Sequence, residues 1–269
     1  MNLSKEEQIL YNHYKDMYQL AQRRGIPVYS NFAGINEINI AYRVLDDQNI
    51  PKQVQSDRMS LFGGYKDAER CIICFMPDVM YESHDIEDFP ISCIKIEPVN
   101  RKFCGQLTHR DYLGTIMSLG IEREQIGDIV VKKEGTEKNT YFIAYVFCKK
   151  SISELILGIE KIKNTTVKTS ITDADNLTIQ QDYKELNGTV VSPRMDAVIS
   201  VAIKTSRSKC LNIIREGKVY LNGRSCTENA KIISDGDIIT VRGYGKFLIE
   251  ISQLKTKKGN YHIIVKQYI

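Results

Sequence analysis

The first stretch has the hydrophobic pattern of an amphipathic helix, in which one face recurs every three or four positions. The residues at this spacing are Ile9, Leu10, His13, Met17 and Leu20. Ser4, with Glu7 three positions later, forms a capping-box pattern that predicts a helix start. Gly25 predicts the end of this helix. A second helical pattern covers residues 36–49, so the chain is predicted to begin with a helical unit over residues 1–66.

From residue 67 onward the pattern changes to short apolar runs of strand length. Strand-like runs cover residues 70–77, 91–98, 127–135, 140–148 and 165–171, and helical patterns cover residues 107–120 and 151–163. Ser151, with Glu154 three positions later, predicts a capped start for the second of these helices. From residue 91 the order is β-α-β-β-α-β, the split arrangement of RRM-type RNA-binding domains. We therefore predict an RRM-like middle domain over residues 67–175.

An RRM stacks bases on exposed aromatic side chains of its sheet. The run over residues 143–148 matches that pattern only in part, because Ile143 and Cys148 stand where stacking aromatics are expected. We expect Tyr141, Phe142 and Phe147 to pack within the core or the sheet. The middle domain is thus predicted to have the shape of an RRM without its base stacking.

The last part of the chain combines two short helical patterns with short strand-like runs. Residues 172–188 are polar and predict a linker, and a final domain is predicted over residues 183–269. The apolar helix faces consist of Met195, Val198, Ile199 and Ala202, then of Cys210, Ile213 and Ile214. Asn222 and Gly223 are a hairpin-turn pair, and residues 238–249 predict a returning strand. The predicted fold class is α+β, in three small domains.

Composition and charge exclude several classes of protein. The chain of 269 residues is 42% hydrophobic and 26% charged, as in ordinary soluble globular proteins, and its net charge is only +4. No apolar run is long enough to span a bilayer. The polar, acidic start MNLSKEEQIL fits neither a secretory nor a mitochondrial presequence. We therefore expect a cytoplasmic protein with no membrane span.

Seven cysteines are scattered along the chain, which suits reduced thiols better than a disulfide framework. Cys71 and Cys74 have C-x-x-C spacing, but a zinc site needs a second ligand pair, and the other cysteines are too dispersed to provide one. A redox pair would stand at a helix start, whereas this run is strand-like. We predict no metal and no cofactor.

The tripeptide formed by His109, Arg110 and Asp111 also occurs in the catalytic loop of protein kinases. That loop places a metal-binding Asn five residues after the Asp, where this chain has Ile116. The chain also lacks a glycine-rich phosphate loop with G-x-G-x-x-G spacing, and it lacks the DFG and APE motifs. The kinase interpretation fails, and no catalytic residue is predicted.

Basic and hydroxyl side chains of the C-terminal domain gather at helix starts and strand ends. Arg207 and Lys209 lie in the first turn of the second helix, an end that attracts phosphate and that cations usually avoid. A solvated basic face would explain any one of these residues alone, but together they favour RNA binding. The predicted RNA-binding residues are Arg194, Ser206, Arg207, Ser208, Lys209, Lys218, Asn222, Arg224, Arg242 and Lys246.

These residues belong to a series of short motifs. They are R-M-D at residues 194–196, S-R-S-K at 206–209, E-G-K-V at 216–219, N-G at 222–223, D-G-D at 235–237 and R-G-x-G-K-F at 242–247. In this order the motifs resemble the S4 RNA-binding domain. The resemblance covers roughly the last third of the chain, and it implies a helix pair and an adjoining strand that clasp structured RNA.

Two further motifs precede this domain, LFGGYKDAER at residues 61–70 and LTHRDYLGTIMSLGIEREQIGDI at residues 107–129. With the S4 motifs last, the chain resembles the YlmH family over nearly its whole length. The resemblance implies a non-enzymatic RNA-binding protein, with rRNA or tRNA on the large ribosomal subunit as the expected partner. Its expected role is the rescue or quality control of stalled translation. We expect a monomer.

Within this resemblance, His109, Arg110 and Asp111 belong to the signature of the middle domain. Arg110 could contact a phosphate as part of a second RNA contact, together with His109 and Arg123. The alternative is structural, with Thr108 or Asp111 satisfying free amides at the helix start. We lean to the structural alternative.

Two other functions fit part of the pattern. A pseudouridine synthase usually carries its S4 unit before a larger catalytic domain with an essential Asp, whereas here the S4 motifs come last, after two small domains. A ribosome-docked adaptor would hold a protein partner, in cell division or assembly, with its N-terminal parts. Removing the residues before Asp67 would discriminate the adaptor, because an unchanged salt dependence of RNA binding would mean that they contact no phosphate.

Overall fold

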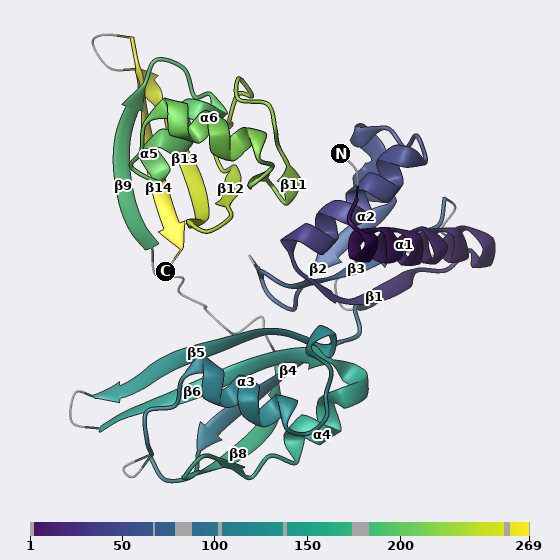
Figure 1. The fold of residues 1–269 in the computed structure, drawn as a ribbon. Helices are drawn as coiled ribbons and strands as arrows, with labels where there is room; N and C mark the ends of the chain where they lie inside the picture. Colours follow the sequence, from purple (N-terminus) through teal and green to yellow (C-terminus); the bar gives the residue numbers. More distant parts are fainter. Residues whose placement is uncertain are drawn as a thin grey trace. The chain divides into compact units, whose positions relative to one another are not determined.

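The computed structural model describes residues 3–66, 68–78, 88–101, 104–136, 139–173, 183–255 and 259–268. The chain divides into two compact units, Met1–Thr178 and Ile179–Ile269. Figure 1 draws the first unit in purple to teal and the second in green to yellow. The first unit contains an N-terminal part and a middle part that contact each other, and the second contains the C-terminal domain.

The N-terminal part packs two helices against a three-stranded sheet. Its elements are α1 (Lys5–Arg24), β1 (Val28–Ala33), α2 (Ile35–Asp47), the 3-10 helix η1 (Lys52–Asp57), β2 (Met59–Phe62) and β3 (Cys71–Phe75). The capping box of α1 is confirmed, since the Ser4 amide donates to Glu7 Oε2 at 2.7 Å and the Glu7 amide donates to Ser4 Oγ at 3.2 Å. Gly25 ends α1 with φ +65°.

The prediction of a helical unit for this part is wrong, because the part also contains a three-stranded sheet. β3 lies in its centre, antiparallel to β1 and to β2. A domain boundary or a truncation at residue 67 would divide this sheet, because β2 precedes residue 67 in the chain and β3 follows it. The pattern hid the sheet because β1 and β2 are short outer strands, and only β3 is a continuous apolar run. Burial raises the pKa of the Cys74 thiol to about 12, as in an inert structural cysteine.

The middle part has the predicted β-α-β-β-α-β order. Its elements are β4 (Ile91–Pro98), α3 (His109–Met117), η3 (Arg123–Gln125), β5 (Ile126–Thr136), β6 (Asn139–Lys149), η4 (Lys150–Ile152), α4 (Ser153–Leu157), β7 (Lys161–Ile162) and β8 (Thr165–Thr172). The sheet order is β5-β6-β4-β8-β7, with antiparallel neighbours throughout. This is the strand order expected of the split arrangement, with the first and third long strands in the centre.

The second helix of the middle part is shorter than predicted. α4 spans only five residues, and the residue that caps it is Ile152, which makes no side-chain hydrogen bond to the helix. The predicted Ser151–Glu154 capping box is therefore absent. The preceding turn is the 3-10 helix η4, and Ser153 Oγ donates to its Lys150 carbonyl at 2.8 Å. Gly158 caps the C-terminal end of α4, so residues 159–163, predicted as helix, lie outside it, and Lys161–Ile162 form β7.

The core of the middle part lies on one side of the sheet. Ile94 and Ile96 of β4 and Val146 of β6 pack there with Tyr112 of α3 and Ile156 of α4, and each of these side chains is fully buried. Helices α3 and α4 thus cover one face of the sheet (Figure 1). No helix in the described residues of the middle part packs in the core on the opposite face.

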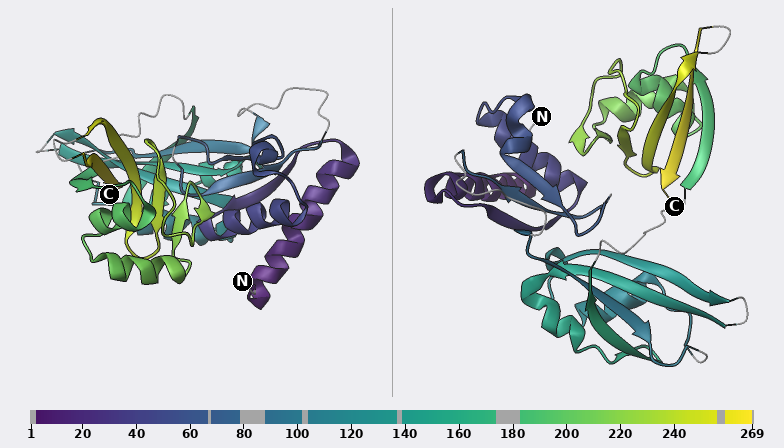
Figure 2. Two further views of the ribbon diagram at one scale, coloured as in Figure 1. Left: turned by 90° about the horizontal axis from the view of Figure 1, so that it is seen from above. Right: turned by 180° about the vertical axis from the view of Figure 1, so that it is seen from behind.

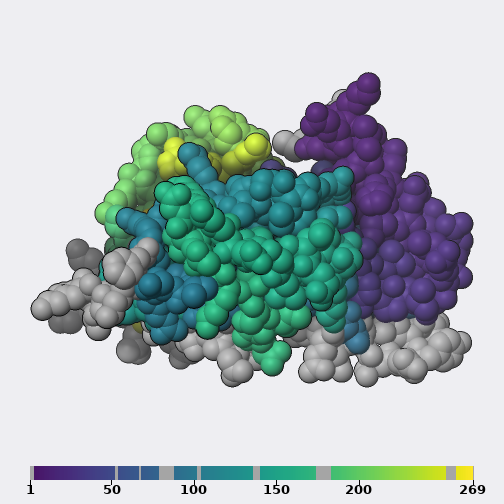
Figure 3. Space-filling view, turned by 90° about the horizontal axis from the view of Figure 1, so that it is seen from below, coloured from purple at the N-terminus to yellow at the C-terminus, as the bar shows by residue number. Residues whose placement is uncertain are grey.

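A short segment, residues 63–70, fixes the middle part to the N-terminal part. The Tyr65 and Phe147 rings lie 4.8 Å apart between centroids, and the Tyr65 hydroxyl donates to Asp128 Oδ2 at 2.8 Å. The Asp128 carboxylate also accepts from two backbone amides of the segment, at 2.7 and 3.2 Å. The purple and teal surfaces of the two parts lie directly against each other in Figure 3.

Gly64→Ala is expected to destabilise this contact. Gly64 has φ +96°, and a Cβ atom there would lie 2.3 Å from Cδ1 of the buried Phe147 ring. Overpacking of this kind costs about 1–3 kcal/mol, and the left-handed backbone adds about 1 kcal/mol. Gly114→Ala in α3 is the control, because nothing beyond its own helix lies within 4 Å of an added Cβ atom. Thermal unfolding of the full chain checks this, and a Gly64 variant as stable as the control would contradict it.

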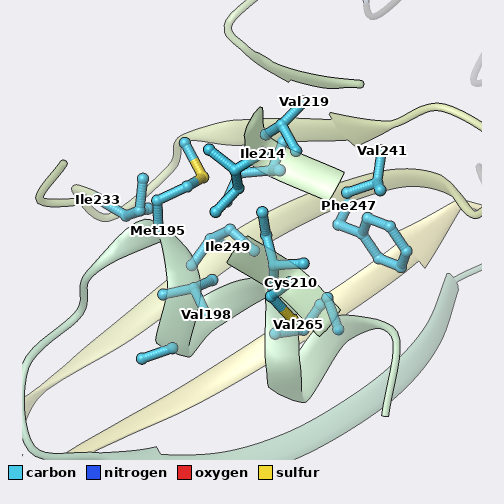
Figure 4. Packing of buried hydrophobic residues seen from close by; sticks show 14 of the residues in the cluster. Met195, Val198, Cys210, Ile214, Val219, Ile233, Val241, Phe247, Ile249 and Val265 are labelled. Carbon is cyan, nitrogen blue, oxygen red and sulfur yellow. The ribbon is translucent and has the colours of Figure 1, made fainter. Parts of the chain in front are cut away.

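The C-terminal domain packs two helices against a six-stranded sheet (Figure 2). Its elements are β9 (Tyr183–Val190), α5 (Met195–Ala202), α6 (Arg207–Arg215), β10 (Val219–Leu221), β11 (Arg224–Ser225), β12 (Ile238–Val241), β13 (Gly245–Lys255) and β14 (Tyr261–Tyr268). The sheet order is β11-β10-β12-β13-β14-β9. The predicted inward faces are confirmed: Val198 of α5 and Cys210 and Ile214 of α6 meet Phe247 and Val265 of the sheet in Figure 4.

Two predictions for this domain need correction. Residues 183–188 of the predicted linker belong to β9, which pairs with β14 along its whole length; residues 174–182 lie outside the described part. β9 is polar because it is an outer strand, with only Val190 fully buried. Residues 238–249 are a hairpin rather than one strand, since β12 and β13 pair around a turn in which Gly243 has φ +85°.

Candidate RNA-binding surface

The first turn of α6 carries four of the predicted RNA-binding residues. Ser206 caps the helix, and its Oγ accepts from the Lys209 amide at 3.4 Å. Ser208 Oγ lies 3.2 Å from Ser206 Oγ. The side chains of Arg207 and Lys209 are exposed. Because all four stand on consecutive residues of one turn, the fold presents them together.

The electrostatics of this turn favour an anion. The positive end of the helix dipole and the free first-turn amides attract negative charge. No acidic residue stands in the first turn of α6 to neutralise it. Among the residues that the structure describes, Arg207 and Lys209 form no ion pair. We call this turn, residues 206–209, the α6 anion site.

Other predicted residues are held by partners of their own. Lys218 and Arg242 lie on adjoining segments, since the Arg242 amide donates to the Lys218 carbonyl at 2.9 Å. Lys218 Nζ lies 2.6 Å from Glu216 Oε2 in an exposed ion pair. Arg194 pairs with Asp196, with 3.1 Å from Nε to Oδ1. The exposed Lys218–Glu216 pair opens readily for a phosphate, because such pairs contribute little stability. The Asp196 side chain is only 9% exposed, so the Arg194 pair is held more firmly.

Asn222 has a structural role in the hairpin. Its amide nitrogen donates to Asp237 Oδ1 at 2.8 Å, and its Oδ1 accepts from the Ile238 amide at 2.8 Å. Both ends of the side chain are therefore engaged within the domain. Asn222 and Gly223 also have φ +49° and +81°, the left-handed pair that a tight hairpin requires. Arg224 follows as the first residue of β11.

Lys246 stands apart from the α6 anion site. On β13 it pairs with Thr240 of β12, whereas the neighbouring Val241 and Phe247 point into the core with the helices. Lys246 is therefore on the sheet face opposite α5 and α6. Its ammonium lies 4.7 Å from the centroid of the Tyr268 ring. The sequence could not place Lys246, because its side depends on the register of the hairpin.

Two comparisons with protein families now bear on these regions. Residues 85–176 match the family described as "Putative RNA-binding domain in YlmH", and residues 194–239 match the S4 domain. The S4 match includes the α6 anion site. A curated relative, "Ribosome-associated protein quality control protein P2" of Bacillus subtilis (strain 168), is 26% identical over 208 residues, 76% of either chain. The chain is thus similar to the YlmH family, with a match to its RNA-binding domain followed by an S4 domain.

One solved structure is also similar, "Cell division protein ylmH from Streptococcus pneumoniae". It is 19% identical, covers 66% of this chain and 97% of its own, and superposes with a TM-score of 0.45. Among the described residues, no helix is long and apolar enough to cross a membrane. In the same part of the chain, no group of three or more His, Cys, Asp and Glu could hold a metal ion.

The motif around Asp111 is built as a helix cap. Thr108 precedes α3, and Asp111 Oδ2 accepts from the Thr108 amide at 2.9 Å. Asp111 Oδ1 lies 2.6 Å from Nζ of Lys163. These hydrogen bonds, first the one from Lys163 and then those from Thr108, lower the pKa of Asp111 from 3.8 to about 2. A carboxylate so committed is a structural group and a poor proton acceptor near neutral pH.

The remaining predicted contacts of this motif differ in availability. His109 and Arg110 are exposed at the start of α3. Arg123 instead donates from Nη1 to the Ile126 carbonyl at 2.6 Å and to the Gly127 carbonyl at 3.3 Å. Burial lowers the pKa of Arg123. Arg123 thus supports the turn at the start of β5. His109 and Arg110 can reach RNA without breaking hydrogen bonds of this kind.

Asp111→Asn is expected to lower the thermal stability of the middle part in a pH-dependent way. A carboxylate whose pKa falls on folding stabilises the fold above its ordinary pKa of 3.8 and loses this effect as the pH falls toward about 2. The difference in melting temperature between wild type and variant should therefore be constant from pH 7 to pH 4 and shrink below it. Asp173→Asn, at an exposed position after β8, is the control. A constant difference down to pH 2 would contradict this account.

Proposed function

We propose that the chain is a ribosome-associated RNA-binding protein that binds structured RNA through the α6 anion site. The observation that carries this is the first turn of α6, where two exposed cations and two hydroxyls stand at a positive helix end. Such a turn fits a phosphate, which accepts hydrogen bonds from amides, hydroxyls and cations alike. Lys218, Arg224 and Arg242 extend the contact on neighbouring segments.

The S4 family match and the name of the relative support a ribosomal target. We propose rRNA or tRNA on the large subunit as the ligand, and quality control of stalled translation as the setting. A duplex RNA target is consistent with the chemistry, since its backbone and 2′-hydroxyls are read by cations and hydroxyl groups. We further propose that the protein acts by binding alone. The acid Asp111, which a catalytic interpretation would require, is committed to Thr108 and Lys163.

Co-sedimentation with purified ribosomal subunits tests this proposal. The full chain is mixed with separated large or small subunits and pelleted through a cushion at 100 and 300 mM salt. Pelleting with large subunits that weakens at higher salt is the expected result, because each phosphate contact releases counterions. Pelleting with small subunits alone would mean that the ligand lies on the small subunit instead. No pelleting with either subunit would refute ribosome association.

A further inference from the structure

The sheet of the middle part has a second face, opposite α3 and α4, which we call the open face. Alternate residues of each strand point to it, as the pairing shows: Tyr145 of β6 pairs with Lys95 of β4 and with Val130 of β5. The next row consists of Ile143, Glu97 and Lys132, with Lys168 of β8 beside Glu97. No residue of the core cluster beneath the helices belongs to these rows.

The open face carries an excess of positive charge. The Glu97 carboxylate is nearly buried and is surrounded by three cations, Lys95 Nζ at 3.1 Å, Arg101 Nη2 at 3.2 Å and Lys168 Nζ at 3.3 Å. Lys132 adds a fourth cation, and Glu134, opposite Tyr141, adds a second carboxylate. The single charge of Glu97 therefore does not neutralise the three cations around it. Arg101 and Lys168 keep more than half of their side-chain surface exposed, at 55% and 62%.

Two tyrosine rings of β6 lie among these cations. Tyr141 is covered by the guanidinium of Arg101, 4.8 Å from the ring centroid, and Lys132 Nζ lies 5.7 Å from the centroid of Tyr145. Both rings are half-buried rather than enclosed. The two tyrosines are four positions apart on one strand, a spacing of about 13 Å. Rings that alternate with cations are the arrangement that binds single-stranded nucleic acid, through base stacking and phosphate contacts.

One end of the open face is closed. Phe147, the third aromatic residue on this side of β6, is fully buried under Tyr65. A ligand on the open face is therefore confined to the part between Tyr145 and Arg101. Of the two positions where stacking aromatics were expected, Ile143 lies on the open face, whereas Cys148 is buried in the core beneath the helices.

We propose that the open face is a second RNA site, which binds a single-stranded segment with bases on Tyr141 and Tyr145 and phosphates on Lys95, Arg101, Lys132 and Lys168. It rests on the proposed function, to which it adds a contact for a single-stranded RNA segment. The rings distinguish it from a surface for an acidic protein, since a carboxylate partner would use the cations without using the rings.

Binding of a fluorescent twelve-nucleotide oligouridylate to the full chain tests this site. The measurement is made in wild type and in Arg207→Glu/Lys209→Glu, which removes the α6 contribution. Lys132→Glu/Lys168→Glu is expected to lower the affinity at least tenfold in both backgrounds. The matched control is Lys133→Glu, whose side chain is exposed on the other side of β5. It should change the affinity less than twofold.

The rings are tested separately from the charges. Tyr141→Leu/Tyr145→Leu should weaken binding about fivefold or more for each ring, the usual loss for a stacked base, without changing the salt dependence. Tyr141→Phe/Tyr145→Phe keeps both rings and should bind as wild type, which shows that the fold is intact. Oligouridylate binding that is unchanged in either the charge variant or the leucine variant would overturn the proposal. Large-subunit binding through α6 would stand in that case, so the two proposals fail independently.

Discussion

Arg207→Glu with Lys209→Glu is expected to weaken binding to ribosomal RNA by about 100-fold or more. Each charge-assisted hydrogen bond to a phosphate contributes about 1.5–3 kcal/mol, and two such losses multiply. Replacing cations by carboxylates adds repulsion from the same phosphates. Both side chains are exposed and without ion pairs in the described part of the chain, so the fold should tolerate the exchange. Glutamate in the first turn of a helix even stabilises the helix, because its negative charge interacts favourably with the positive end of the helix dipole.

Salt dependence shows whether the loss comes from phosphate contacts. The slope of log affinity against log salt should fall by about two in the variant, one for each contact removed. The matched control is Lys184→Glu/Arg215→Glu, which changes the net charge equally at two exposed positions outside the first turn of α6. Equal losses in both variants would mean that binding responds to net charge, and the α6 anion site would lose its role.

Phe247→Ala is expected to destabilise the C-terminal domain by about 3–5 kcal/mol, the usual range for removing a large buried aromatic side chain. Phe247 is 1% exposed and packs between the sheet and the helices, with Cys210 and Val241 among its neighbours in the core (Figure 4). A loss of this size approaches the total stability of many small domains. The α6 anion site should then be lost with the fold that positions it.

Denaturant unfolding and hydrogen exchange of the amides in β12, β13 and β14 measure this effect. Tyr244→Ala is the control, because it removes an aromatic ring from the same hairpin at a position that is 40% exposed. It should cost less than about 1 kcal/mol. If the two variants were equally stable, the core would not be packed around Phe247 as described.

Most elements of the fold that depend on local sequence were predictable, with the Ser151–Glu154 capping box as an exception. The capping box at Ser4, the inward faces of α5 and α6 and the Asn222–Gly223 turn each follow from residues close together in the chain. Elements that depend on distant pairing were not. β3 lies in the N-terminal sheet although its sequence neighbours suggested the middle domain, and the polar β9 is held by β14, which is distant in sequence.

The sites divide in the same way. The α6 anion site was predictable because its four residues are consecutive on one helix turn. The open face was not, since its rows depend on register, and a bulge between Ile126 and Ile129 shifts the register of β5 against β6. Arg123 was assigned to a possible RNA contact because the pattern cannot show that its guanidinium is held by the carbonyls of Ile126 and Gly127.

The most direct test of the central claim is cross-linking of the full chain to RNA in cells, with the cross-linked RNA sequenced from gradient fractions. The proposed function predicts co-migration with large subunits and cross-links to rRNA and tRNA. These should disappear with Arg207→Glu/Lys209→Glu and persist with Lys184→Glu/Arg215→Glu. Migration as free protein with no enriched RNA, or equal cross-linking by both variants, would contradict it.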